Sequence, residues 1–151
     1  MILTPHILVG AAIGSKIKNP LWVFLIAFFS HFILDMIPHA EYDVSVLKEK
    51  LRFNKKFICP FFEIIIDLII GFGILWFSTK FFFFKKISTI YIGAISGIIP
   101  DAFTILYWQT NNKIFKALTN FHVFHSRKIS RRWGIITEIA VSLLAIFVFL
   151  Y

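Results

Sequence analysis

The chain has 151 residues, of which 58% are hydrophobic and 20 are phenylalanine, and its mean hydropathy is +0.80. This composition is too apolar for an ordinary soluble domain, so we expect one integral membrane domain over residues 1–151. In a membrane protein, a net charge of +8 bears first on orientation in the membrane and on contact with anionic lipid. Basic and aromatic residues do not interleave in the way that reads bases, so we expect no nucleic-acid partner.

The apolar runs are continuous rather than alternating, which favours helices, because in lipid the backbone must satisfy its own hydrogen bonds. We predict an all-α, polytopic membrane bundle of about five hydrophobic helices, covering residues 4–15, 21–37, 57–78, 87–108 and 134–151. The first has about 12 residues and reaches roughly 18 Å, short of a ~30 Å hydrocarbon core. It is therefore expected to be re-entrant or tucked among the other helices.

Two polar segments separate these helices. Residues 39–56 predict either an amphipathic helix at the membrane surface or a solvated loop, and residues 109–133 form the longest polar stretch. Eleven of the 16 Lys and Arg residues lie in these two segments, which share a side if all five helices span. The positive-inside rule then places both segments and the N-terminus in the cytoplasm, in a multi-pass protein of the cell membrane.

The stretch Ser30–Asp43 contains His31, Asp35 and His39 at steps of four residues. On a helix this spacing puts them on one face, where an imidazole and a carboxylate can point at one cation. The alternative is a buried polar face that satisfies itself by hydrogen bonds. Because Pro38 disfavours a helical conformation before it, we expect His39 beyond the helix end, at the rim of any site.

All histidines and all acids within the predicted helices fall near the same, cytoplasmic leaflet. They are His6, His31, Asp35, His39, Glu63, Asp67, Asp101, His122, His125 and Glu138. Ionisable residues inside a membrane are costly and normally face a partner or a cavity, and no Lys or Arg lies in a helix interior to pair with these acids. A bound cation removes the repulsion between the acids, and imidazoles beside carboxylates suit zinc.

Small residues continue the same helix faces in four-residue steps. Gly10 and Gly14 follow His6, Gly71 follows Asp67, Gly97 and Gly93 precede Asp101, and Ala27 precedes His31. Such spacing lets membrane helices approach closely. Generic packing with incidental polar ends is the alternative, but four coincidences favour helices that converge on one metal site.

Four stretches carry a resemblance to a known family: TPHILVGAAIG at 4–14, SHFILDMIPH at 30–39, SGIIPDAF at 96–103 and FHVFHS at 121–126. They resemble the membrane-bound metal-dependent hydrolases, a family of small prokaryotic integral membrane proteins, and more distantly the zinc-dependent phospholipase C superfamily. The resemblance implies an all-helical fold and a metal site whose ligands are His6, His31, Asp35, Asp101, His122 and His125.

The leading hypothesis is a zinc-dependent hydrolase whose site opens toward the inner leaflet and whose substrate is a phosphoester or lipid-linked molecule. The sequence leaves the number of zinc ions open. Glu63 or Asp67 is predicted to be the general base or to complete the coordination. The basic cluster at 127–132 is expected either to attract anionic groups or to act as a positive-inside anchor.

Two other functions stay open on the sequence. Buried acids and histidines also form cation or proton pathways, although a pathway needs polar groups through both halves of the membrane. A structural metal that only joins helices is the third option, and a closed site with four protein ligands is typical of it.

Overall fold

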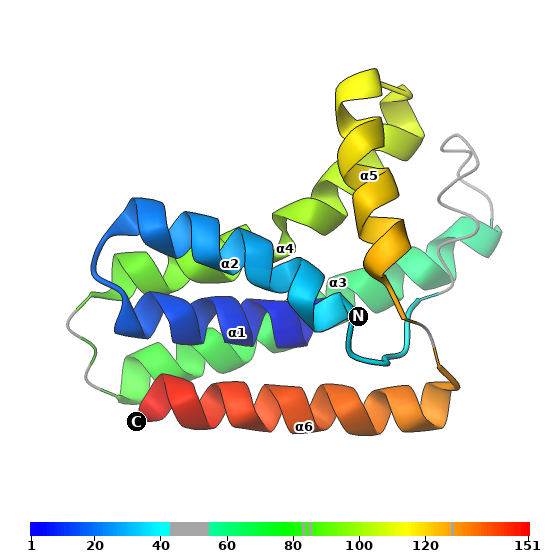
Figure 1. The fold of residues 1–151 in the computed structure, drawn as a ribbon. Coiled ribbons are helices and arrows are strands. Elements are labelled where there is room, and N and C mark those ends of the chain that lie inside the picture. Colours follow the sequence, from blue (N-terminus) through cyan, green and yellow to red (C-terminus); the bar gives the residue numbers. More distant parts are fainter. Residues whose placement is uncertain (43–54, 83, 85, 128) are drawn as a thin grey trace.

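The computed structural model describes residues 1–42, 55–82, 84, 86–127 and 129–151, with the backbone alone for 55–59, 124 and 125 (Figure 1). Every regular element in this part of the chain is a helix: α1 (Leu3–Lys16), α2 (Pro20–Asp35), α3 (Lys55–Phe81), α4 (Ile87–Thr110), α5 (Lys113–His125) and α6 (Arg131–Leu150). Three segments, Pro60–Phe81, Ile87–Thr110 and Arg131–Leu150, are long and apolar enough to cross a membrane. The all-helical fold is confirmed and three of its helices could span a membrane, whereas the count of five spanning helices stays a prediction.

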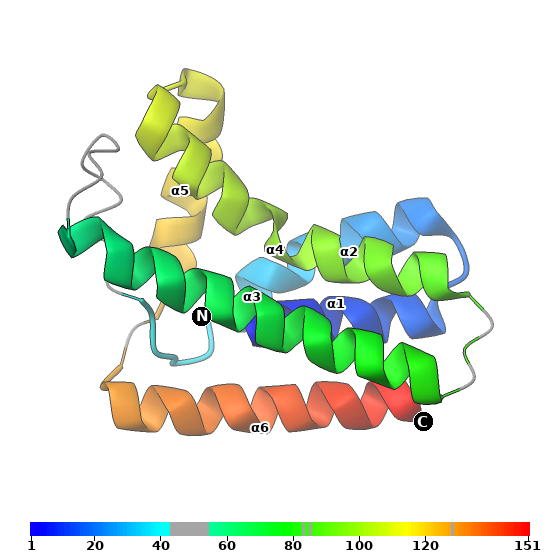
Figure 2. The same ribbon diagram turned by 180° about the vertical axis from the view of Figure 1, so that it is seen from behind.

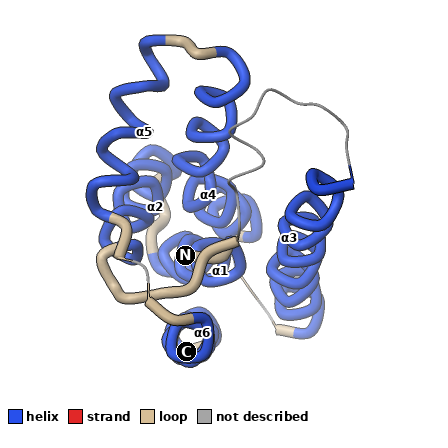
Figure 3. The backbone as a smooth tube through the Cα atoms, turned by 90° about the vertical axis from the view of Figure 1, so that its right-hand side faces the viewer, coloured by secondary structure: helices blue, strands red, loops and turns tan. Residues whose placement is uncertain are grey.

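The short first helix is the centre of the bundle. It packs against α2, α3, α4 and α6, and Figure 3 shows it surrounded by them. Ten of its 14 residues are buried, including Ile7, Leu8 and Ala11. A helix that is apolar on nearly all sides needs neighbours on all sides, which explains why so short an element is placed in the core. The structure therefore places it among the other helices, and re-entrance into a membrane stays a prediction.

Helices α1 and α4 cross at contact distance through glycines. A Cβ atom on Gly10 or Gly14 would collide with the backbone of Gly93 or Thr89, and one on Gly97 would lie 2.6 Å from the carbonyl oxygen of His6. The four-residue glycine steps thus act as the sequence predicts. This close approach brings the start of α1, with His6, against the middle of α4.

Helix α4 bends part-way along its length, as Figures 1 and 2 show, and its second half leads away from the bundle. Pro100 lies inside this helix and supplies a cause for the bend, because proline removes one helical hydrogen bond and clashes with the preceding turn. Asn111 then ends α4 in the left-handed conformation (φ 52°), and the Asn112 side chain caps α5 by accepting from the N–H of Ile114 at 2.9 Å.

Helix α5 lies within residues 109–133, for which the sequence predicts only a long polar stretch and no hydrophobic helix. It is amphipathic rather than continuously apolar, so a search for apolar runs passes over it. The predicted surface segment at 39–56 falls largely on residues 43–54, which lie outside the described part of the chain.

The chain that follows α2 is fixed by two partners. His39 donates its N–H to the Arg127 carbonyl at 3.0 Å and accepts from the N–H of Ile129 at 3.1 Å, so the segment pairs with the α5–α6 connection. On the other side, Gly134 at the start of α6 packs directly on Ala40, where any Cβ would collide with the backbone. This double contact carries His39 back toward the end of α2.

Candidate metal centre

Five polar side chains converge at the end of the bundle where α1 begins and α2 ends. They are His6 from α1, His31 and Asp35 from α2, Asp101 from α4 and His122 from α5. Two sets of three have ligand atoms that all lie within 4.8 Å of one another: His6 with His31 and Asp101, and His31 with Asp35 and His122. These buried His and Asp groups could hold a metal ion.

The distances around His31 fit a compact cation site. Its Nε2 lies 3.2 Å from Asp35 Oδ2, 3.3 Å from His122 Nε2 and 3.7 Å from Asp101 Oδ1. Ligands about 2.0–2.2 Å from a tetrahedral zinc ion are separated by about 3.3–3.6 Å. His122 Nε2 is 3.6 Å from Asp101 Oδ1 but only 2.6 Å from Asp35 Oδ2, a hydrogen-bond length that a bound metal would have to widen.

Three imidazoles are held in the same tautomer by contacts behind the site. The Nδ1–H groups of His31 and His39 each donate at 2.7 Å to a backbone carbonyl, of Gly97 and Ile37 respectively. His122 Nδ1 lies 3.1 Å from the hydroxyl oxygen of Thr104. That hydroxyl donates its hydrogen to the Pro100 carbonyl at 3.1 Å. Its oxygen can therefore only accept from His122, so the Nδ1 of His122 carries the hydrogen.

Each of these histidines therefore turns its Nε2 toward a carboxylate, and this nitrogen either carries a second proton or presents a lone pair. A lone pair and a carboxylate oxygen repel unless a proton or a metal ion lies between them. Histidines that bind metals donate their second N–H to an oxygen in this way, which fixes the ring and raises its basicity. The arrangement at His31, His39 and His122 is the one that a metal site needs.

His6 gives an independent sign of a missing ligand. Its ring is fully buried and stacks on that of His31 with centroids 4.0 Å apart. Neither of its ring nitrogens has a hydrogen-bond partner among the described residues, although Nε2 lies 3.3 Å from Asp35 Oδ1. Buried polar atoms are almost always satisfied, so an ion bound at Nε2 would remove one of these two exceptions.

His39 corrects one expectation. It lies past the end of α2, as Pro38 predicts, but it is completely buried rather than at a rim. Its Nε2 lies 3.9 Å from Asp35 Oδ1 and 3.2 Å from Glu41 Oε1. The reason is the pairing with residues 127–129, which no local sequence pattern reveals.

The two predicted catalytic acids have different surroundings. Glu63 is exposed on α3, whereas Asp67, one turn further on, is buried against the first turn of α1. Asp67 accepts from the N–H groups of Leu3 at 2.5 Å and Thr4 at 3.1 Å, and also from the hydroxyls of Thr4 and Tyr42. These contacts are those of a helix cap supplied by a second helix. The catalytic role of either acid stays a prediction.

The Tyr42 hydroxyl, which donates to Asp67, has a raised pKa. Burial, followed by the negative charge of Asp67, raises the pKa of the phenol well above its usual value. The hydroxyl is therefore a permanent donor at any physiological pH. A second acid, Glu138 of α6, accepts from the N–H of Ile2 at 3.4 Å, so acids from two helices satisfy the start of α1.

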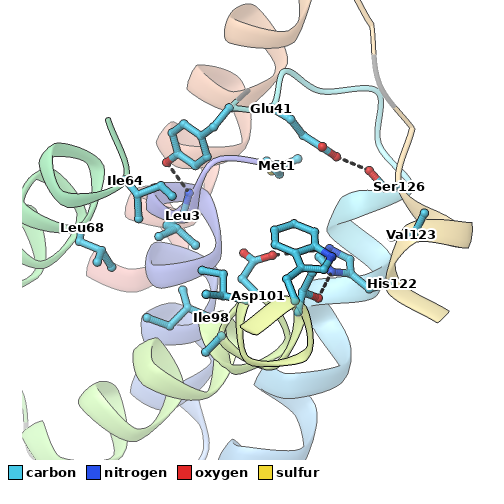
Figure 4. A pocket seen from close by; sticks show the side chains of 15 residues that line it. Met1, Leu3, Glu41, Ile64, Leu68, Ile98, Asp101, His122, Val123 and Ser126 are labelled. Carbon is cyan, nitrogen blue, oxygen red and sulfur yellow. Dashed lines mark hydrogen bonds and ion pairs between the residues drawn. The ribbon is translucent and has the colours of Figure 1, made fainter. Parts of the chain in front are cut away.

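A pocket of about 260 Å³ adjoins the cluster (Figure 4). Asp101, His122, Glu41 and Ser126 contribute polar groups to its lining. Most of the remaining lining is apolar and comes from α3 and α4, together with Met1, Leu3 and Val123. The side chains of Asp101 and His122 are 23% and 12% exposed, whereas His6, His31 and Asp35 are fully buried. The candidate centre is thus open on the side of Asp101 and His122.

The sequence predictions give no role to four residues of the site: Glu41, Tyr42, Thr104 and Ser126. Glu41 accepts a hydrogen bond from the Ser126 hydroxyl, across a separation of 85 residues. Thr104 lies one helical turn after Pro100 and could have been noticed as a hydroxyl on the Asp101 side of α4. The His125 side chain, which the resemblance implies as a ligand, lies outside the described part of the structure.

Comparisons of the chain with models of protein families, with curated proteins and with solved structures found no match.

Proposed function

We propose that this protein is a membrane-embedded, metal-dependent hydrolase, with zinc as the metal and a phosphoester or lipid-linked molecule as the substrate. The observation that carries the proposal is a set of three imidazoles whose Nδ1 atoms bond to oxygens and whose Nε2 atoms face Asp35. The Nε2 atoms of His31 and His122 also face Asp101. When bound, a zinc ion would supply a Lewis acid that activates water near neutral pH. The opening beside Asp101 and His122 gives a substrate access to that ion.

The residues have separate parts in this proposal. His31, Asp35, His122 and Asp101 would hold the metal, with His6 and His39 on the other oxygen of Asp35. Thr104 and the carbonyls of Gly97 and Ile37 keep the imidazoles in register. Glu41 joins Glu63 and Asp67 as a candidate base, because its carboxylate lines the same pocket as Asp101.

An anionic substrate is supported by the chain beside the site. The backbone N–H of Arg127 donates to the Asp35 carbonyl at 3.0 Å, which places the basic segment next to the centre. Arg127, Arg131 and Arg132 are all exposed and available to a phosphate group. The cytoplasmic membrane, with the site toward the inner leaflet, remains our proposal for its location.

The test is metal content followed by hydrolysis. The protein, purified in detergent, should contain stoichiometric zinc, and His31→Ala and Asp35→Ala should lose it while the exposed-acid control Glu63→Gln keeps it. Wild-type protein without stoichiometric metal, or metal unchanged in both variants, would refute the metal site. Metal without turnover in a screen of soluble and lipid phosphoesters would favour a structural ion, and metal uptake into vesicles would favour transport.

A further inference from the structure

The pocket beside the metal ligands has a polar part and an apolar part. In Figure 4 Asp101 and His122 lie near each other and the Glu41–Ser126 pair lies beyond Met1, while Ile64 and Leu68 lie on the other side of the pocket and Ile98 lies beside Asp101. The apolar part continues along α4, where Ile105 and Trp108 also line it. A small, fully hydrated substrate would not cover these apolar side chains, so they would stay in contact with water, which is unfavourable.

Much of the apolar lining comes from two helices suited to a membrane, α3 and α4. Both α3 and α4 pack against α1, and Figure 3 shows α1 between them. We call the part of the pocket lined by Ile64 and Leu68 of α3 and by Ile98, Ile105 and Trp108 of α4 the groove. Each of these two helices is long and apolar enough to span the hydrocarbon core. Next to the groove residue Leu68, the α3 residue Ile69 is 66% exposed, as expected for a side chain in contact with lipid.

We propose that the groove between α3 and α4 binds the hydrocarbon chain of a phosphate-bearing membrane lipid, whose polar group lies at Asp101 and His122. This inference rests on the proposed function and specifies its substrate class. The substrate enters sideways from the bilayer, and its chain takes the place of neighbouring lipid against Ile64, Leu68 and Ile98. Its phosphate then lies between the metal ligands and the exposed arginines of the 127–132 segment.

The experiment uses photolabelling of the full-length protein in phosphatidylcholine nanodiscs. The probe is a phosphatidic acid with a diazirine in one acyl chain, added as a minor component, and labelled residues are mapped by mass spectrometry. Labelling should concentrate on the groove residues of α3 and α4. The variant Leu68→Trp, which fills the groove, should lower that labelling about tenfold, since each excluded methylene group costs roughly a factor of four in affinity.

The adjacent residue provides a matched control. Ile69→Trp places the same side chain on the same helix but on its exposed face, so groove labelling should not change. If Leu68→Trp does not fold, Ile105→Trp tests the groove from α4. Labelling spread evenly over the lipid-exposed surface, or groove labelling that survives both groove variants, would overturn the inference.

Metal content separates this inference from the proposed function. Stoichiometric zinc without groove labelling would overturn the lipid substrate and leave the metal centre intact, as expected for a water-soluble phosphoester. Groove labelling of a protein that binds no metal would instead overturn the hydrolase and, with it, the substrate role of the bound lipid.

Discussion

Asp67→Asn is the most informative single change, because it tests whether this acid caps a helix or performs chemistry. The carboxylate receives N–H groups from Leu3 and Thr4 and hydroxyls from Thr4 and Tyr42. Asparagine has the same shape but only one acceptor oxygen, no charge, and an NH₂ group that would face donors. If Asp67 is a cap, the variant should lose stability and keep its metal.

The size of the loss follows from these contacts. A hydrogen bond to a charged group contributes about 1.5–3 kcal/mol. The single carbonyl oxygen of the asparagine side chain would keep part of this contribution, and its NH₂ group would lose the rest. The lost charge at a partly buried helix N-terminus removes about 1–2 kcal/mol more. We expect a total of about 3 kcal/mol, which for a chain of this length lowers Tm by about 6–12 °C.

The assay is thermal unfolding in detergent at neutral pH, with zinc content measured on the same samples. Glu63→Gln is the matched control, because it neutralises an exposed acid one turn earlier on α3 and should leave Tm within about 2 °C of wild type. An Asp67→Asn protein with unchanged Tm but abolished hydrolysis would refute the capping role and support catalysis by this acid. Loss of zinc at unchanged Tm would instead make Asp67 a ligand.

Three further predictions follow from neighbouring contacts. Gly93→Ala should lower Tm, because its Cβ would collide with the Gly10 backbone. Gly73→Ala, whose Cβ would meet no atom within 4 Å, should instead raise the free energy of unfolding by about 1 kcal/mol. Equal Tm shifts in the two variants would contradict the close α1–α4 crossing. Thr104→Val should weaken zinc binding about tenfold in a competition titration with a chelator, and unchanged affinity would show that His122 needs no partner behind it. Tyr42→Phe should lower the free energy of unfolding at every pH below about 10. Above that pH the difference from wild type should shrink, because the phenol ionises in the unfolded chain before it ionises in the folded protein, where its pKa is raised. A stability difference that stays constant through and above a pH of about 10 would refute this coupling.

Much of the fold could be predicted from the sequence because the physics involved is local. Continuous apolar runs require helices in a membrane, and glycines four residues apart predict a close crossing, which α1 and α4 form. The spacing of His31 and Asp35 predicts a shared helix face, and the structure brings their side chains to 3.2 Å. In each case the relevant residues lie within a few turns of one another.

The surroundings of His39 and of the acids on α3 could not be predicted in the same way. Glu63 and Asp67 are one turn apart on one apolar helix, and their difference depends on where the start of α1 lies. His39 is buried because its backbone pairs with residues 127–129, far along the chain. Neither outcome has a local pattern, since both depend on contacts between distant segments.

The sequence by itself determined that the chain is helical, with helices apolar enough to span a membrane, and that His31 and Asp35 share one helix face. Composition and helical period decide these features, because they act through the solvent and through neighbours on the same helix. Only the tertiary structure decided that His6, His31, Asp35, Asp101 and His122 meet, that Asp67 caps α1, and that an apolar groove adjoins the cluster. These depend on how α1 is seated among its neighbours and on the bend of α4, which no single helix specifies alone.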